Sequence, residues 1–128
     1  MPVEDLNHVN INAPQPLLDR LRDFYVDIIG LREGPRPPVP IPGYWLYAGD
    51  KPVVHLMDAA AMPGHHPQPG ARGHLDHIAF SCTDVAGMET RLLAAGVPFR
   101  RNDIREFGIV QLVVTDPAGL DVELNISD

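Results

Sequence analysis

The stretch Asp-Leu-Asn-His-Val-Asn-Ile-Asn at residues 5–12 returns in altered form as His-Leu-Asp-His-Ile-Ala-Phe-Ser at residues 74–81. Both contain Leu-(Asn/Asp)-His-(Val/Ile), and both alternate polar and apolar residues as β-strands do. The repeated histidines, His8 and His77, are 69 positions apart. The sequence therefore predicts two strands at equivalent places in a duplicated chain.

An amphipathic helix pattern follows each of these strands. Pro16 suits the first turn of the first helix and Gly30 its end, with apolar positions at Leu17, Leu18, Leu21, Phe24, Tyr25 and Ile28. Asp84 suits the N-cap of the second helix and Gly96 its end, with apolar positions at Val85, Met88, Leu92 and Leu93.

Three further strands are expected in each half, at residues 31–35, 43–48 and 52–57 and at residues 98–104, 108–115 and 120–126. The last strands match as well, because Val-Val-His-Leu around His55 corresponds to Asp-Val-Glu-Leu around Glu123, at an offset of 68. A second anchor with nearly the same offset supports an internal duplication of a βαβββ unit.

The predicted fold is therefore α+β, with two βαβββ modules. We expect one domain over residues 1–128, with module one at 1–58, a Pro- and Gly-rich linker at 59–73 and module two at 74–128. Residues 35–42 hold five prolines and are expected to be an extended surface loop or a rim over a pocket.

Composition narrows the class of protein. A chain of 128 residues with a formal charge of −7 lacks the clustered basic residues that nucleic acid or anionic membranes require. It has no apolar run long enough to span a bilayer, and Glu4 and Asp5 stand where a signal peptide is basic. A single cysteine, Cys82, forms no disulfide framework. We expect a cytoplasmic protein with a small-molecule partner.

Strand alternation collects ligand-type side chains on one face of each predicted sheet. His8 shares a face with Asn10 and Asn12, and His77 shares one with Ser81. His55 and Glu123 lie on the corresponding faces of the last strands. This polar face either meets solvent or lines a cleft, and imidazole and carboxylate groups are common metal ligands.

The chain resembles the vicinal oxygen chelate superfamily, which includes glyoxalase I, extradiol dioxygenases, methylmalonyl-CoA epimerase and the fosfomycin and bleomycin resistance proteins. The segments that carry the resemblance are Leu6–Val9, Phe24-Tyr25 with Gly30-Leu31, Leu75–Phe80, Asp116-Pro117-x-Gly119 and Val122–Leu124. The resemblance implies paired βαβββ modules that form a cupped mixed sheet around a metal cleft. The cleft would hold one divalent metal that binds adjacent oxygens of the substrate.

By position, the resemblance implies that His8, His77 and Glu123 are the metal ligands, in a two-histidine, one-carboxylate site with open positions. The favoured metal is Fe²⁺, and Ni²⁺, Zn²⁺, Co²⁺ and Mn²⁺ remain possible. The sequence does not decide whether the modules pair within one chain or between two chains of the homodimer that we expect.

His55 is the position that discriminates between the activities of the family. Glyoxalase I and the epimerase usually place Glu or Gln there, whereas extradiol dioxygenases have an acid–base histidine beside the metal in the corresponding strand. His55 is therefore expected to be a catalytic acid–base group or, alternatively, a fourth ligand. A structural histidine is the third possibility.

The narrower functional expectation is an extradiol-like dioxygenase acting on a catechol-like compound. The assisting tyrosine of that class has no match, because Val113 stands near its place. The alternatives are a glyoxalase I- or epimerase-like lyase or isomerase, and a metal-free resistance protein that binds a small molecule.

Asn10, Trp45 and Tyr47 are the candidate substrate-binding residues, although Trp45 and Tyr47 equally suit core packing. Three arginines could attract an anionic substrate, but solvent-exposed surface charge is the simpler expectation for them: Arg100, Arg101 and Arg105. His65 and His66 belong to the linker, and Cys82 is expected to face the helix.

Overall fold

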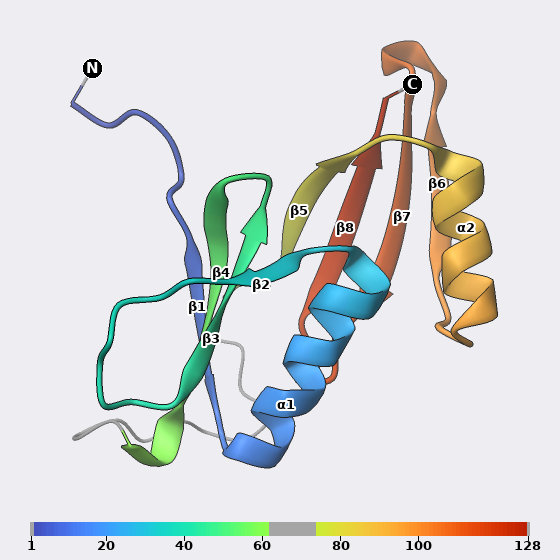
Figure 1. Cartoon of the computed structure of the whole chain (residues 1–128). Helices are drawn as coiled ribbons and strands as arrows, with labels where there is room; N and C mark the ends of the chain where they lie inside the picture. Colours follow the sequence, from blue (N-terminus) through green and yellow to red (C-terminus); the bar gives the residue numbers. More distant parts are fainter. Residues whose placement is uncertain (1, 62–73, 128) are drawn as a thin grey trace. The chain divides into compact units, whose positions relative to one another are not determined.

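The computed structural model describes residues 2–61 and 74–127 and separates into two compact units, Met1–Pro69 and Gly70–Asp128. Each unit contains one βαβββ module (Figure 1).

Module one begins with strand β1 (Val9–Ala13) and helix α1 (Gln15–Asp23), which continues as a π-helical segment, Phe24–Ile29. Three strands follow, β2 (Arg32–Gly34), β3 (Gly43–Ala48) and β4 (Lys51–Asp58), and a 3₁₀ turn at Ala59–Ala61 closes the described part. The sheet order is β1-β4-β3-β2, with β1 parallel to β4 and the other pairs antiparallel.

Helix α1 packs on one face of this sheet, against β1, β3 and β4. Pro16 lies in its first turn, and Gly30 ends the helical stretch with φ +99°, a left-handed conformation that suits glycine. The side chains that form this core are buried: Leu18, Leu21, Phe24, Tyr25, Leu46, Val54 and Leu56. The opposite face of the sheet is left to polar and aromatic side chains.

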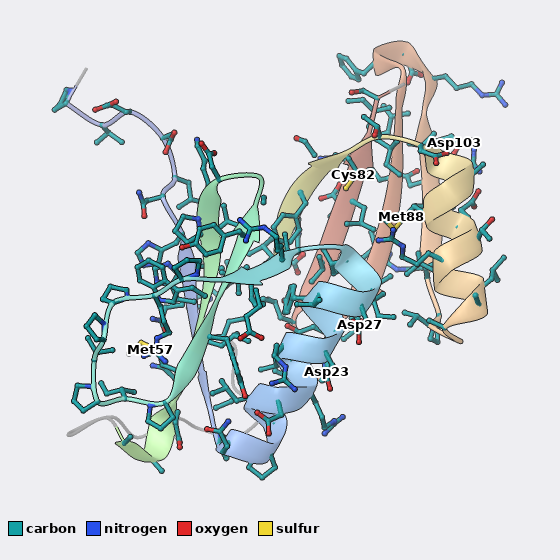
Figure 2. The ribbon with its side chains drawn as sticks, in the orientation of Figure 1. Asp23, Asp27, Met57, Cys82, Met88 and Asp103 are labelled. Atoms are coloured by element: carbon teal, nitrogen blue, oxygen red, sulfur yellow. The ribbon has the colours of Figure 1, made fainter. Side chains whose placement is uncertain are left out.

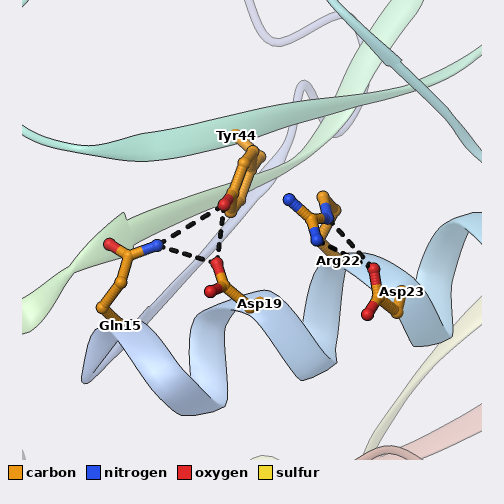
Figure 3. Close-up of polar contacts among 5 residues, drawn as sticks. All are labelled: Gln15, Asp19, Arg22, Asp23 and Tyr44. Carbon is orange, nitrogen blue, oxygen red and sulfur yellow. Dashed lines mark hydrogen bonds and ion pairs between the residues drawn. The ribbon is translucent and has the colours of Figure 1, made fainter.

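A polar contact also joins α1 to the sheet. The Tyr44 hydroxyl on β3 donates a hydrogen bond of 2.6 Å to Asp19 Oδ1, and the Gln15 amide donates to the same oxygen at 2.8 Å (Figure 3). The Arg22 guanidinium lies over the Tyr44 ring, 4.7 Å from its centroid. These contacts fix the side of α1 that borders the sheet.

Module two repeats the same order of elements. It consists of β5 (His77–Cys82), α2 (Val85–Ala94), β6 (Arg100–Ile104), a 3₁₀ turn (Arg105–Phe107), β7 (Ile109–Thr115) and β8 (Asp121–Ile126). Its sheet order, β5-β8-β7-β6, with β5 parallel to β8, is that of module one. The α+β class and the two βαβββ modules are thereby confirmed.

The core of module two lies on one face of its sheet, where the apolar side chains of the last two strands are fully or almost fully buried: Leu112, Val114, Val122, Leu124 and Ile126. Helix α2 adds the fully buried Leu92, and its Glu89 forms an ion pair of 3.0 Å with Arg101 on β6. The other face of the sheet carries His77 and Glu123.

The predicted elements differ from the structure in some details. Leu93 was expected on the apolar face of α2, but it is 71% exposed, because only Leu92 of the pair points into the core. The first strand of each module begins later than expected, so His8 immediately precedes β1. The linker histidines, His65 and His66, lie outside the described residues, and the module boundaries at 58 and 74 stay a prediction.

Among the described residues, the two α-helices have 9 and 10 residues, and no helix is long and apolar enough to cross a membrane.

Candidate metal and substrate site

The pair His77 and Glu123 is the most closely engaged set of candidate ligands. The imidazole Nε2 of His77 lies 3.0 Å from Oε2 of Glu123. Strand register explains the contact, because Glu123 on β8 pairs with Ala79, two residues beyond His77 on the parallel strand β5. Both side chains therefore point from the same face. Glu123 is buried, with 8% of its surface exposed.

A second carboxylate orients the His77 ring. Asp76 Oδ2 lies 2.8 Å from Nδ1 of His77 and accepts a hydrogen bond from that nitrogen. This hydrogen bond raises the pKa of His77 above its ordinary value, and the charges of Glu123 and Asp121 add to the effect against the opposing influence of desolvation. With Nδ1 protonated, Nε2 is the nitrogen directed at Glu123.

This arrangement fits a divalent metal. Two ligand atoms about 2.1 Å from one ion and at a right angle to each other are about 3.0 Å apart, the spacing of His77 Nε2 and Glu123 Oε2. A carboxylate on the remote nitrogen of a ligand histidine is the usual outer-shell partner. In neither module do three His, Cys, Asp or Glu side chains of the described part gather into a metal-binding group. A complete ligand set therefore needs donors beyond this pair.

Module one presents its candidate donors in a stack of three rings. The His55 ring lies between Trp45 and His8, with centroids 4.0 Å and 3.8 Å away and interplanar angles of 10° and 12°. Trp45 is the cross-strand partner of His55, whereas His8 lies just before β1. Trp45 thus packs on the face opposite α1, against the candidate acid–base residue.

His55 is buried, and one of its nitrogens is held by the backbone. Its Nε2 lies 3.0 Å from the Pro52 carbonyl oxygen, which accepts a hydrogen bond from that nitrogen. Desolvation lowers the pKa of His55, and nearby His8 lowers it further, while the Pro52 contact opposes both. No group among the described residues hydrogen-bonds Nδ1. His55 is therefore a mostly neutral imidazole with an available lone pair.

His8 is exposed, and Asn7 Oδ1 lies 2.8 Å from its Nδ1. A metal binds imidazole in the ring plane, along the nitrogen lone pair. Since the His8 and His55 rings are nearly parallel and 3.8 Å apart, these two side chains do not converge on a single ion as they lie. The stack leaves Nε2 of His8 as a ligand atom and favours a separate role for His55.

The other predicted binding residues on this face have contacts of their own. Asn10 on β1 is exposed and lies beside His55. Its Nδ2 donates a hydrogen bond of 3.1 Å to the sulfur of Met57 on β4, which is labelled in Figure 2. The Tyr47 hydroxyl donates to the Pro35 carbonyl, and Arg32 lies over its ring. Tyr47 thus anchors the start of the Pro-rich segment.

The candidate face of module two is hollowed. An open hollow of about 590 Å³ is lined by Asp76, His77, Arg100, Arg101, Asn102, Gln111, Val113, Asp121 and Glu123. Asn102 and Gln111 are not among the residues predicted from the sequence, although the alternation of β6 and β7 places both on the face of Glu123. Val113 is the cross-strand partner of Glu123. Cys82 is half-buried on β5, and burial raises the pKa of its thiol.

Comparison with known proteins decides the family. The model of the Glyoxalase/Bleomycin resistance protein/Dioxygenase superfamily matches residues 5–124. The chain belongs to this superfamily. The resemblance seen in the sequence, to the group that joins glyoxalases, resistance proteins and dioxygenases, is thereby confirmed.

Relatives within the superfamily are diverse. Glyoxylase I 4 of Arabidopsis thaliana is 31% identical over 123 residues, which cover 93% of this chain and 68% of that protein. The structure of lactoylglutathione lyase from Agrobacterium tumefaciens has a TM-score of 0.68 at 24% identity, and the match covers 98% of this chain and 96% of that chain. An antibiotic binding protein from a Streptomyces species has a TM-score of 0.70 at 20% identity, covering 100% and 99%. The two structural likenesses show the fold alone, and the superfamily includes enzymes and binding proteins.

Proposed function

We propose that this chain is a divalent-metal-dependent enzyme that acts on a small oxygenated substrate, with His8, His77 and Glu123 as the metal ligands. The two modules of one chain, or modules of two chains in a homodimer, would supply the three ligands. The observation that carries the proposal is the 3.0 Å spacing of His77 Nε2 and Glu123 Oε2, with Asp76 on the remote nitrogen of His77. The metal, when bound, supplies a Lewis acid for two neighbouring substrate oxygens.

In this proposal His55 is the acid–base residue. Its Nε2 is engaged by Pro52, its ring is held between Trp45 and His8, and its lowered pKa keeps it neutral near pH 7. A neutral imidazole accepts a proton from a substrate hydroxyl at Nδ1 and returns it later. The parallel rings of His8 and His55 support this role over that of a fourth ligand.

The narrower proposal is extradiol-like oxygenation of a catechol-like compound with Fe²⁺, because such chemistry needs an acid–base histidine beside the metal. The alternative is a lyase or isomerase with Ni²⁺, Zn²⁺, Co²⁺ or Mn²⁺, with His55 as a ligand. The 31% identity to Glyoxylase I 4 supports that alternative. Asn10, Trp45 and Tyr47 are proposed to border the substrate. The cytoplasmic location stays a prediction.

Metal analysis of the purified protein tests the proposal. We expect about one ion per site in the wild type, and a loss of bound metal in His8→Ala, His77→Ala and Glu123→Gln. His74→Ala is the matched control, because His74 is an exposed imidazole three residues before His77. A wild-type protein that binds no divalent metal, and shows no shift in Tm on metal addition, would leave the binding-protein alternative.

Assays then separate the two reactions. Anaerobic loading with Fe²⁺ followed by oxygen uptake over a panel of catechols tests the narrower proposal. His55→Ala is expected to keep its metal and lose turnover. Loss of metal from His55→Ala, together with absent oxygen uptake by the wild type, would favour the lyase or isomerase.

A further inference from the structure

The hollow of module two has two ends of different chemistry. One end is acidic, with the His77–Glu123 pair and the carboxylates of Asp76 and Asp121. The other end is formed by β6 and β7, with Arg100, Asn102 and Gln111. A ligand that fills the whole hollow therefore needs a metal-binding group at one end and, at the other end, a group that a guanidinium binds.

Arg100 is the cation that is available at this second end. Its neighbour Arg101 also lines the hollow, but it is already paired with Asp103 at 2.8 Å and with Glu89 of α2 at 3.0 Å. Arg100 has no hydrogen-bond or ion-pair partner among the described residues, and it lines two adjoining hollows of this module. Its charge is therefore not used to stabilise the module.

Sheet register fixes the distance between the two ends. Arg100 pairs with Val113, and Val113 pairs with Glu123, so the three residues form one row across β6, β7 and β8. Two strand spacings place the Cα atoms of Arg100 and Glu123 about 10 Å apart. Val113 stands between them as an apolar floor. This row suits a short carbon skeleton with a polar group at each end.

Two amides border the same end. Asn102 Nδ2 donates to Gln111 Oε1 at 3.1 Å, which occupies the oxygen of Gln111 and leaves its amide N–H groups as donors. Guanidinium and amide donors together match the two oxygens of a carboxylate. Asp121 also lines the hollow, and its charge disfavours a dianion such as phosphate more than a carboxylate.

We propose that Arg100 binds a carboxylate of the substrate, so that the substrate class is a small acid with two neighbouring oxygens at the end remote from its carboxylate. Gln111 assists as a second donor. The placement of the oxygens near His77 and Glu123 rests on the proposed function, whereas the carboxylate subsite rests on Arg100, Val113 and Gln111 alone.

Calorimetric titration of the full chain tests this subsite with a matched pair of probes. Catechol and 3,4-dihydroxybenzoate both carry neighbouring oxygens, and only the second carries a carboxylate. Protein loaded with Zn²⁺ is used, because this ion is redox-inert and the probes are not consumed. We expect wild-type protein to bind 3,4-dihydroxybenzoate at least tenfold more tightly than catechol.

Arg100→Gln is expected to bind both probes with equal affinity while its Zn²⁺ content and Tm match those of the wild type. Arg105→Gln is the control, because Arg105 is exposed and does not line the hollow; it should keep the tenfold preference. Equal binding of the two probes by the wild type, or an unchanged preference in Arg100→Gln, would overturn the subsite.

A failure of the proposed function gives a different result. If the wild type binds no Zn²⁺, benzoate is titrated into metal-free protein. Benzoate binding that Arg100→Gln weakens about tenfold upholds the carboxylate subsite without the metal site. No benzoate binding by metal-free wild type in that case overturns the subsite as well.

Discussion

His77 on β5 and Glu123 on β8 are diagonal neighbours across a parallel strand pair, and their Nε2 and Oε2 atoms lie 3.0 Å apart. His8 and His55 occupy the same relation in module one, because His55 pairs with Asn10, two residues beyond His8. One module joins its pair through an ion pair and the other through stacked rings. In each module, the duplicated backbone thus places one pair of potential metal ligands at the same diagonal position across a parallel strand pair.

Asp76→Asn should weaken metal binding without removing a ligand. The carboxylate of Asp76 accepts a hydrogen bond from Nδ1 of His77 and so, in the proposed site, would direct Nε2 to the ion. Loss of such an outer-shell partner typically lowers metal affinity about 10–100-fold. Competition with a chromophoric chelator measures the change, and the stoichiometry should stay that of the wild type.

The control for this change is Asp103→Asn, which removes a carboxylate that is paired with Arg101 on the same module (Figure 2). It should leave the metal affinity unaltered. An Asp76→Asn protein with wild-type affinity would show that His77 needs no carboxylate partner for ligation.

His55 is predicted to be the Nε2–H tautomer in its neutral form, because the Pro52 carbonyl accepts a hydrogen bond from that nitrogen. Long-range ¹H–¹⁵N correlation spectra of ¹⁵N-histidine-labelled protein, treated with chelator, report the tautomer directly. Its pKa should lie below the ordinary value of about 6.5, in the direction that burial imposes.

The sign of the associated stability change follows from that pKa. Below pH 6.5 the unfolded chain takes up a proton at His55 more readily than the folded chain does, so stability falls as the pH falls through this range. His55→Gln should flatten the acidic limb of the Tm profile. A His55 signal that titrates at or above 6.5, or that shows the Nδ1–H tautomer, would contradict the stacked and buried geometry.

Much of the fold could be predicted from the sequence, because backbone elements leave periodic signals. The strand alternation around His8 and His77 and the repeated offset to His55 and Glu123 gave the duplication and the faces of both sheets. Leu93 was misassigned because a helical period admits both Leu92 and Leu93 on a broad face, and only packing distinguishes them.

Less of the candidate site could be predicted, because side-chain partners depend on contacts between strands. Periodicity placed Trp45 on the face of His55 but did not distinguish a ring stack from core packing. It also gave no reason to separate Arg100 from Arg101. Only the strand register and the Glu89 and Asp103 contacts show that Arg101 is paired, whereas Arg100 has no such partner in the described part of the chain.

Asp84 should be sensitive to replacement by alanine and tolerant of asparagine. It caps α2 by accepting a hydrogen bond from the Gly87 amide at 3.0 Å, and it does so with φ +67°. Asp84→Ala loses the cap and places alanine in a left-handed conformation, which together cost about 2 kcal/mol. Asparagine keeps an acceptor oxygen and tolerates this conformation, so Asp84→Asn should stay close to the wild type.

Urea unfolding measures both variants, and Gly87→Ala serves as a third. A Cβ at Gly87 would lie 2.2 Å from Asp84 Oδ2, so the cap would have to move. Gly87→Ala is therefore expected to be destabilised although alanine favours helices. Equal stability of Asp84→Ala and Asp84→Asn would show that the cap contributes nothing.

Tyr44→Phe should destabilise the protein more at neutral pH than in acid. The Tyr44 hydroxyl lowers the pKa of Asp19, and the Gln15 amide adds to this effect (Figure 3). A carboxyl whose pKa is lower in the folded chain contributes stability above its unfolded value of about 3.9, and this contribution disappears as the pH falls through the folded value. Phenylalanine removes the largest cause of the shift.

Thermal unfolding between pH 7 and pH 2 should therefore show a Tm difference between wild type and Tyr44→Phe that narrows below about pH 4. In an Asp19→Asn background the same substitution should give a difference that does not vary with pH, since no carboxylate remains to titrate. A Tm difference that is equally large at both ends of the range in the wild-type background would mean that Tyr44 acts through packing on Arg22 and not through Asp19.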